Sequence, residues 1–359
     1  MSLLEPRPAP SQWMRLLSPL LACVLTLFGG AILFWLLGHN PVLAFRVFFI
    51  DPLNSANGLS EWLLKASPLI LIAQGLAVGF RARVYNIGAE GQLIAGATLA
   101  GGVALWLDGS GNPLVAHITL PLMIVAGAVG GGLWGALPAL LKTRFRADET
   151  LTTLMLTYIA SLGLAWLVNG PWRDPNGMNF PQTILFSDKA LFPLLFEGLR
   201  VNASVFITLF AIVGFWFFNA RSFLSYQLTV AGQAPHAARY AGFSGARTVW
   251  FSLVISGMCA GLAGVGEVAG PVGQLNLNLS PGYGFAAIIV AYLGRLNPIG
   301  IVVSGLLMAL IYLGGEAAQV TLQLPSAITG LFQGMLLFFL LGADVLVDFR
   351  LRRPRRHPA

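Results

Sequence analysis

Residues 114–141 read LVAHITLPLMIVAGAVGGGLWGALPALL, a stretch of 28 residues without an Asp, Glu, Lys or Arg. A helix needs about 20 apolar residues to cross the roughly 30 Å hydrocarbon core of a bilayer, so this stretch can span a membrane. The whole chain shares this character, because 56% of its 359 residues are apolar and 10% are charged. Soluble domains carry about 25% charged residues. The composition therefore predicts a membrane protein and excludes a fused soluble enzyme or DNA-binding module.

Ten apolar runs, separated by charges, prolines and polar clusters, predict an all-α polytopic membrane protein with about ten transmembrane helices. The runs are 16–38, 63–80, 87–107, 114–141, 151–168, 201–219, 248–269, 283–294, 298–315 and 327–343. The run 283–294 is too short to cross a bilayer alone. It fits a half-helix, a re-entrant element, or a span that its flanks lengthen.

The basic residues predict the orientation of these helices. Ten crossings place 16 of the 21 Lys and Arg residues on one side of the membrane and five on the other. Loops rich in Lys and Arg stay in the cytoplasm, so both termini are expected there. The expected organisation is a cytoplasmic N-terminal segment over residues 1–15, a transmembrane domain over 16–343 and a basic cytoplasmic tail over 344–359.

No catalytic or metal-binding pattern accompanies the apolar runs. Cys23 and Cys259 lie inside apolar stretches, and the four histidines are scattered without the spacing of metal ligands. The sequence contains no G-x-x-x-x-G-K-[ST], G-x-S-x-G or H-E-x-x-H segment. We therefore expect no metal and no cofactor in this chain, and no ATP hydrolysis by it.

Polar residues inside apolar runs are the first candidates for a transport path, because burying them in a membrane is costly. Asn86, Glu90 and Gln92 stand among small residues where the third run begins, and Glu267 lies between glycines near the end of the seventh. The competing interpretation is structural: these side chains hold helices together through hydrogen bonds. Glycines are also concentrated in the runs, around 127–135 and 257–270, which favours close helix packing.

Residues 233–242 lie in the longest internal cytoplasmic stretch and have the signals of a short helix. Pro235 stands near its start and Gly242 at its end. Such a helix, held at both ends by membrane spans, fits a docking site for a soluble partner or a plain connector.

Four segments carry a resemblance to a known family: YNIGAEGQ (85–92), ETLTTLML (149–156), AARYAG (237–242), and SPGYGF (280–285) running on to LGRLNP (293–298). In these segments the chain resembles the permease subunits of bacterial ABC importers of the simple-sugar and nucleoside branch. Its N-I-G-x-E-G-Q form resembles the nucleoside type. Two positions depart from the family pattern, namely Gln233-Ala234 before the proline and Thr157, where an Asn is common.

The resemblance implies a multi-pass protein of the bacterial cytoplasmic (inner) membrane. It implies a heterodimer with a second homologous permease, two cytoplasmic subunits that bind ATP and Mg, and an extracytoplasmic substrate-binding protein, with no nucleic acid as partner. Segment 233–242 matches the coupling helix that docks on the ATPase. The residues expected there are Gln233, Pro235, Ala237, Ala238, Arg239, Tyr240 and Gly242.

The function that follows from the resemblance is an alternating-access path for a nucleoside or a related small polar solute. The residues expected to line or support it are Asn86, Glu90, Gln92, Glu267 and Tyr283. A simple-sugar importer is the alternative within the family. An ion-driven secondary transporter, in which membrane carboxylates couple ion and substrate, and a membrane scaffold without transport are the rivals outside it.

Overall fold

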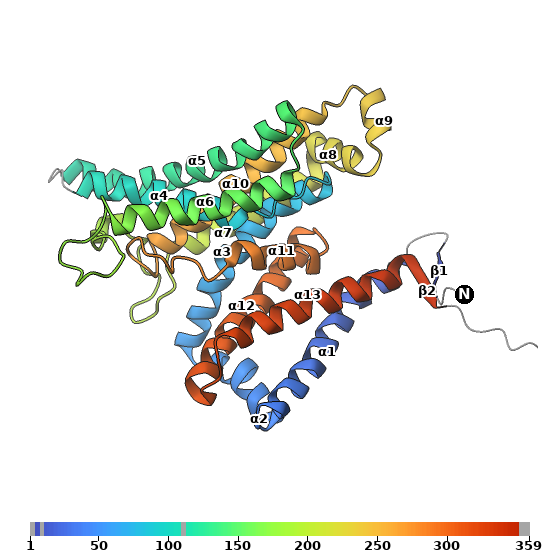
Figure 1. The fold of residues 1–359 in the computed structure, drawn as a ribbon, viewed down its shortest axis with the longest axis horizontal. Helices are drawn as coiled ribbons and strands as arrows, with labels where there is room; N and C mark the ends of the chain where they lie inside the picture. Colours follow the sequence, from blue (N-terminus) through green and yellow to red (C-terminus); the bar gives the residue numbers. More distant parts are fainter. Residues whose placement is uncertain (1–3, 8–10, 109–112, 352–359) are drawn as a thin grey trace, which may run out of the picture. The chain divides into compact units, whose positions relative to one another are not determined.

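The computed structural model describes residues 4–7, 11–108 and 113–351 and is almost entirely helical (Figure 1). The predicted basic tail lies outside the described residues from 352 onward. The helices over the apolar runs are α1 (Gln12–Leu36), α3 (Ala56–Arg81), α4 (Ala89–Asp108), α5 (Pro113–Phe145), α6 (Glu149–Asn169), α7 (Ser204–Arg221), α10 (Gly245–Val268), α11 (Tyr283–Leu293), α12 (Pro298–Leu322) and α13 (Ala327–Asp348). The shorter elements are β1 (Leu4–Pro6), α2 (Pro41–Phe45), η1 (Arg46–Ile50), η2 (Asp51–Leu53), η3 (Asp188–Ala190), α8 (Phe223–Gln233), α9 (Pro235–Tyr240) and β2 (Phe349–Leu351).

Each of the ten apolar runs coincides with a helix, which confirms the predicted fold class. Within the described residues, eight helices are long and apolar enough to cross a membrane, all except α4 and α11 among the ten. Helix α4 has 20 residues but carries polar side chains near both ends, and α11 has 11. The two short strands, which the sequence did not predict, pair antiparallel with Leu4 opposite Leu351.

The helices form two compact units, one comprising the described residues up to Ser55 and from Leu310, the other comprising Ala56–Ala309. In the first unit, α1 packs along α13. The hydroxyl of Ser18 donates a hydrogen bond of 2.7 Å to the Asp344 carboxylate. Phenylalanine rings fill the core, and those of Phe48 and Phe332 stack with their centroids 4.8 Å apart.

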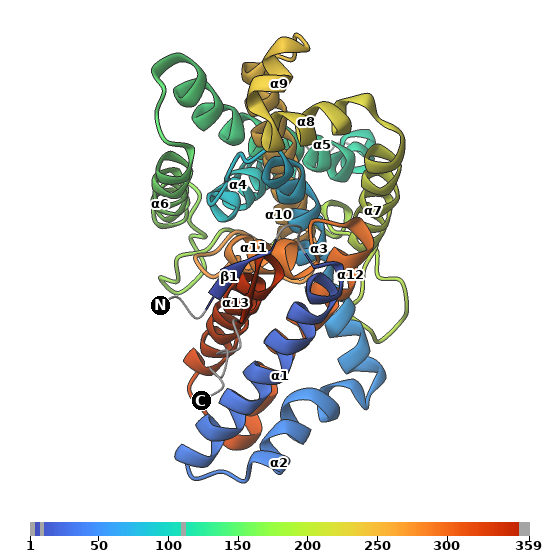
Figure 2. The same ribbon diagram turned by 90° about the vertical axis from the view of Figure 1, so that its right-hand side faces the viewer.

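The second unit is built around α3, which is buried along most of its length. Its most apolar window of 18 residues is 89% buried, as expected for a helix that is hydrophobic on all sides. Figure 2 shows α3 among the other helices of the unit, and it contacts α7, α10 and α11.

Glycines bring α5 and α10 together in the same unit, as the sequence predicted. A Cβ atom added at Gly131 would lie 2.1 Å from the carbonyl oxygen of Gly257, and one at Gly261 would lie 2.1 Å from that of Gly127. No side chain fits at such distances. The two backbones are therefore in direct contact, which only glycine permits.

Candidate functional site

The eighth apolar run is a half-helix. Helix α10 ends at Val268, residues 269–282 are not helical, and α11 runs from Tyr283 to Leu293. Its 11 residues rise about 16 Å, about half of the hydrocarbon thickness. Of the three forms that the sequence left open, the half-helix is the one observed.

The non-helical segment before α11 follows α4 for a considerable depth. The Leu275 side chain packs against Gly101 of α4, and the backbone of Gly284 packs against Glu90 near the start of α4. Gly101 and Glu90 are 11 residues apart, about 16 Å along the helix. Residues 275–284 therefore run alongside α4 toward its N-terminus.

A second non-helical turn, residues 82–88, meets this half-helix and lies at the middle of the bundle. The Asn86 amide nitrogen donates a hydrogen bond of 2.9 Å to the hydroxyl of Ser256, which is the twelfth of the 24 residues of α10. Helix α10 crosses the membrane, so Asn86 lies near mid-depth. Two helices, α4 and α11, thus begin at the centre of the unit with their N-termini together.

Asn86 and Gln92 close the turn that starts α4. The Asn86 amide nitrogen donates a hydrogen bond of 2.8 Å to the Gln92 side-chain oxygen, and the Asn86 side-chain oxygen accepts one of 3.0 Å from the Gly88 backbone. Both side chains are buried, with exposed fractions of 2% and 1%. Their polar groups are therefore satisfied within the chain, as buried amides require.

Glu90 links the two helix starts. Its carboxylate accepts a hydrogen bond of 2.6 Å from the backbone nitrogen of Gly284 in the first turn of α11, and it also bonds with the Ser280 side chain and the Gly282 backbone. A carboxylate at a helix N-terminus satisfies free N–H groups and interacts favourably with the helix dipole. Glu90 therefore anchors the half-helix to α4.

Helix α6 packs against the other side of this turn. Cβ atoms added at Gly88 and Gly91 would lie 2.3 Å from the Thr153 carbonyl oxygen and 2.6 Å from the Thr157 Cα. The Thr153 hydroxyl also accepts a hydrogen bond of 3.2 Å from the Ile87 backbone. Thr157, which departs from the family pattern, is thus a residue of this helix contact.

The five predicted path residues fall in two places. Asn86, Glu90, Gln92 and Tyr283 meet at the half-helix, where Tyr283 is 3% exposed. Glu267 lies 11 residues further along α10 than Ser256, about 16 Å away along the axis. It is buried beside the charges of Lys65, Arg200 and Glu61.

Sequence reasoning missed the exposed neighbours of these buried groups. Tyr85 and Phe285 are each 41% exposed and Leu277 is 48% exposed, and Asn278 and Pro281 are also exposed. Irregular backbone at membrane depth does not face lipid. It is tolerated where it lines a water-filled cavity or another protein surface. Tyr85 adjoins the buried Asn86 in sequence, and that adjacency was the available signal.

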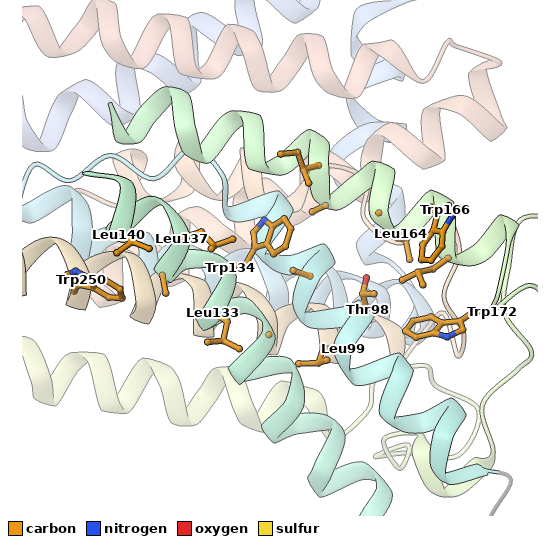
Figure 3. A pocket seen from close by; sticks show the side chains of 17 residues that line it. Thr98, Leu99, Leu133, Trp134, Leu137, Leu140, Leu164, Trp166, Trp172 and Trp250 are labelled. Atoms are coloured by element: carbon orange, nitrogen blue, oxygen red, sulfur yellow. The ribbon is translucent and has the colours of Figure 1, made fainter. Parts of the chain in front are cut away.

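A large cavity in the same unit has a different character. It is an open groove of about 690 Å³ between α4, α5 and α6, with Trp134, Trp166, Trp172 and Trp250 along it (Figure 3). Its one threonine, Thr98, uses its hydroxyl in a hydrogen bond of 2.7 Å to the Ile94 carbonyl. An almost wholly apolar lining suits hydrocarbon and offers a polar solute few hydrogen bonds.

The predicted short helix is present as α9. Pro235 is its first residue, and Gly242 follows its end with a φ of +77°, a left-handed conformation that suits glycine. Gln233, Ala237 and Arg239 are exposed, and Tyr240 is 96% exposed, whereas Ala238 is buried. Helix α9 therefore presents most of its side chains outward, at the end of the unit (Figure 1).

Comparisons with known proteins identify the family of the chain. The family described as the branched-chain amino acid transport system permease component matches residues 58–341. The glucose ABC transporter permease protein TsgB13 of Haloferax volcanii is 33% identical over 97% of this chain and 92% of its own length. The guanosine permease NupP of Bacillus subtilis is 30% identical (90% and 92%), and the nucleoside permease NupB of Lactococcus lactis is 30% identical (91% and 90%).

No solved structure matches the chain. Its relatives and its long apolar helices make it a multi-pass protein of the cytoplasmic membrane. The family match covers the whole region that contains the half-helix, the turn at residues 82–88 and helix α9. The chain belongs to the permease-component family of ABC-type transport systems.

Proposed function

We propose that this permease forms, with a second permease, the path of an ATP-driven importer for nucleosides. The observation that carries the proposal is the pair of helix starts at mid-depth, held by Glu90 and bordered by exposed irregular backbone. Broken helices of this kind build substrate sites in transporters. The guanosine and nucleoside permeases among the relatives support the choice of solute.

The proposed partners follow from what the chain lacks and what it exposes. Two ATP-binding subunits supply the energy, and an extracytoplasmic binding protein delivers the solute. Bacillus subtilis has two matching guanosine permeases, NupP and NupQ, which supports a heterodimer of related permeases. The excess of basic residues on one predicted side supports cytoplasmic termini and a cytoplasmic α9.

The route from α9 to the path runs through α8. Gly232 of α8 packs against the backbone of Arg81 and Ala82, where the turn 82–88 begins. The Arg81 guanidinium donates hydrogen bonds to Asn219 and to the Leu296 carbonyl, just beyond α11. A displacement of α9 by the ATPase would therefore act on the start of the turn 82–88 and on the segment that follows α11.

A simple sugar is the second candidate solute, because TsgB13 is named a glucose permease. Uptake assays on cells that carry the complete importer distinguish the two candidate solutes. We expect ATP-dependent uptake of guanosine and uridine that survives a protonophore when cellular ATP is maintained. Uptake of glucose alone would show that the solute is a sugar. Uptake that follows the proton gradient would contradict an ATP-driven importer.

Replacing Tyr240 by alanine should weaken association with the ATP-binding subunits at least tenfold, because exposed aromatic residues often dominate protein interfaces. Co-purification measures this effect. Folding should not change, since Tyr240 is 96% exposed. The matched control is Tyr158→Ala on α6, which removes a tyrosine that is 59% exposed. Labelling of a Tyr240→Cys variant only from outside the cell would contradict the proposed orientation.

A further inference from the structure

Three aromatic rings gather at the far end of the half-helix. The rings of Phe80, next to last in α3, and Tyr292 of α11 stack with centroids 5.0 Å apart and an interplanar angle of 22°. The ring of Tyr85, in the turn 82–88, lies 6.0 Å from that of Phe80. Phe80 is buried at 6% exposure, so it backs the other two rings.

The outer rings of this cluster are accessible. Tyr85 is 41% exposed, and Tyr292 is partly exposed. Tyr292 also follows Phe285, which is 41% exposed, at a spacing of seven residues, so the two side chains lie on the same face of α11 about 10 Å apart. The exposed aromatic face thus runs from Phe285 at the mid-depth junction, along the half-helix to Tyr292, and on to Tyr85 in the turn 82–88.

Accessible tyrosine rings provide specific chemistry. Their faces stack on flat, conjugated rings. A nucleobase has such a flat ring, and a purine has a larger one than a pyrimidine. A free pentose or hexose has none, so a sugar gains less from this surface than a nucleoside does.

We infer that Tyr85 and Tyr292, backed by Phe80, form a stacking surface for the nucleobase on the transport path, and that this surface favours purine nucleosides over pyrimidine nucleosides and sugars. The inference rests on the proposed function, because it requires that the exposed face of α11 borders the path. In this arrangement the aromatic rings determine the selectivity of the membrane path. The buried amides of Asn86 and Gln92, together with Glu90, hold the backbone from which the rings project.

The experiment compares Tyr85→Leu and Tyr292→Leu with Tyr85→Phe and Tyr292→Phe in the complete importer. Stacking of a base on one aromatic ring changes the binding affinity about tenfold. We expect each leucine variant to lower the guanosine transport rate about tenfold and the uridine rate less, and each phenylalanine variant to keep both rates. Tyr158→Leu, at another exposed tyrosine of the same unit, should match the unchanged protein.

Three results would overturn the inference. The first is a loss that is equal for guanosine and uridine. The second is a phenylalanine variant as impaired as the leucine variant. The third is a leucine variant that no longer co-purifies with the second permease, which would make the rings a subunit contact. An unchanged importer that transports neither nucleoside would instead refute the proposed function, and the stacking surface with it.

Discussion

Replacing Glu90 by alanine is expected to abolish uptake, and Glu90→Gln is expected to reduce uptake about tenfold without loss of membrane insertion. The carboxylate accepts a hydrogen bond of 2.6 Å from the Gly284 backbone and bonds with Ser280 and Gly282. Alanine leaves the buried Gly284 N–H without its acceptor, at a cost of about 1–3 kcal/mol, and removes the contacts with Ser280 and Gly282. Glutamine keeps an acceptor oxygen but loses the charge that strengthens the hydrogen bonds.

The measurement is guanosine uptake normalised to the amount of protein in the membrane. Glu197→Gln is the matched control, because Glu197 is an exposed glutamate outside the half-helix contact, and its uptake should equal that of the unchanged importer. Full uptake by Glu90→Gln would show that the charge at the start of α11 has no part in transport. The carboxylate would then serve only as one hydrogen-bond acceptor among others.

Gly131→Leu is expected to prevent the contact between α5 and α10, and therefore to prevent the protein from folding. Even a Cβ atom at Gly131 would lie 2.1 Å from the Gly257 carbonyl oxygen and 2.7 Å from the Gly261 Cα. Overpacking a core typically costs about 1–3 kcal/mol, and here the obstacle is backbone, which yields less than a side chain. We expect the cost to exceed this range, against total stabilities of about 5–15 kcal/mol.

Thermal unfolding and size-exclusion chromatography in detergent measure this loss. Gly163→Leu, on α6, is the control, because a Cβ atom there meets nothing within 4 Å. It should fold as the unchanged chain does. Equal melting temperatures for the two variants would contradict the close approach of α5 and α10.

Much of the fold could be predicted from the sequence because the signals are local. Each apolar run became a helix, since backbone polar groups in lipid must be satisfied within the helix itself. The length of 283–294 showed that this run is too short to cross a bilayer alone, and Pro235 and Gly242 marked the two ends of the region of α9. The glycines near 131 and 261 indicated a close helix contact.

The roles of individual residues at the site depended on contacts between distant segments. Asn86 and Gln92 could equally have faced a cavity, but Ser256 and the Gly88 backbone complete their hydrogen bonds. Glu267 shares a run with Ser256 yet lies 11 residues from it, about 16 Å along the axis of α10. Tyr85 carries no polar signal inside an apolar run, and only its surroundings make it accessible.

By itself the sequence determined the ten helical runs, the shortness of the eighth and the ends of α9, because hydropathy and capping act over a few neighbouring residues. The tertiary structure alone decided that Glu90 anchors the α11 backbone and that Tyr85 and Tyr292 are left exposed beside Phe80. The Glu90–Gly284 and Phe80–Tyr292 contacts each join residues about two hundred positions apart, and no local pattern specifies such pairs.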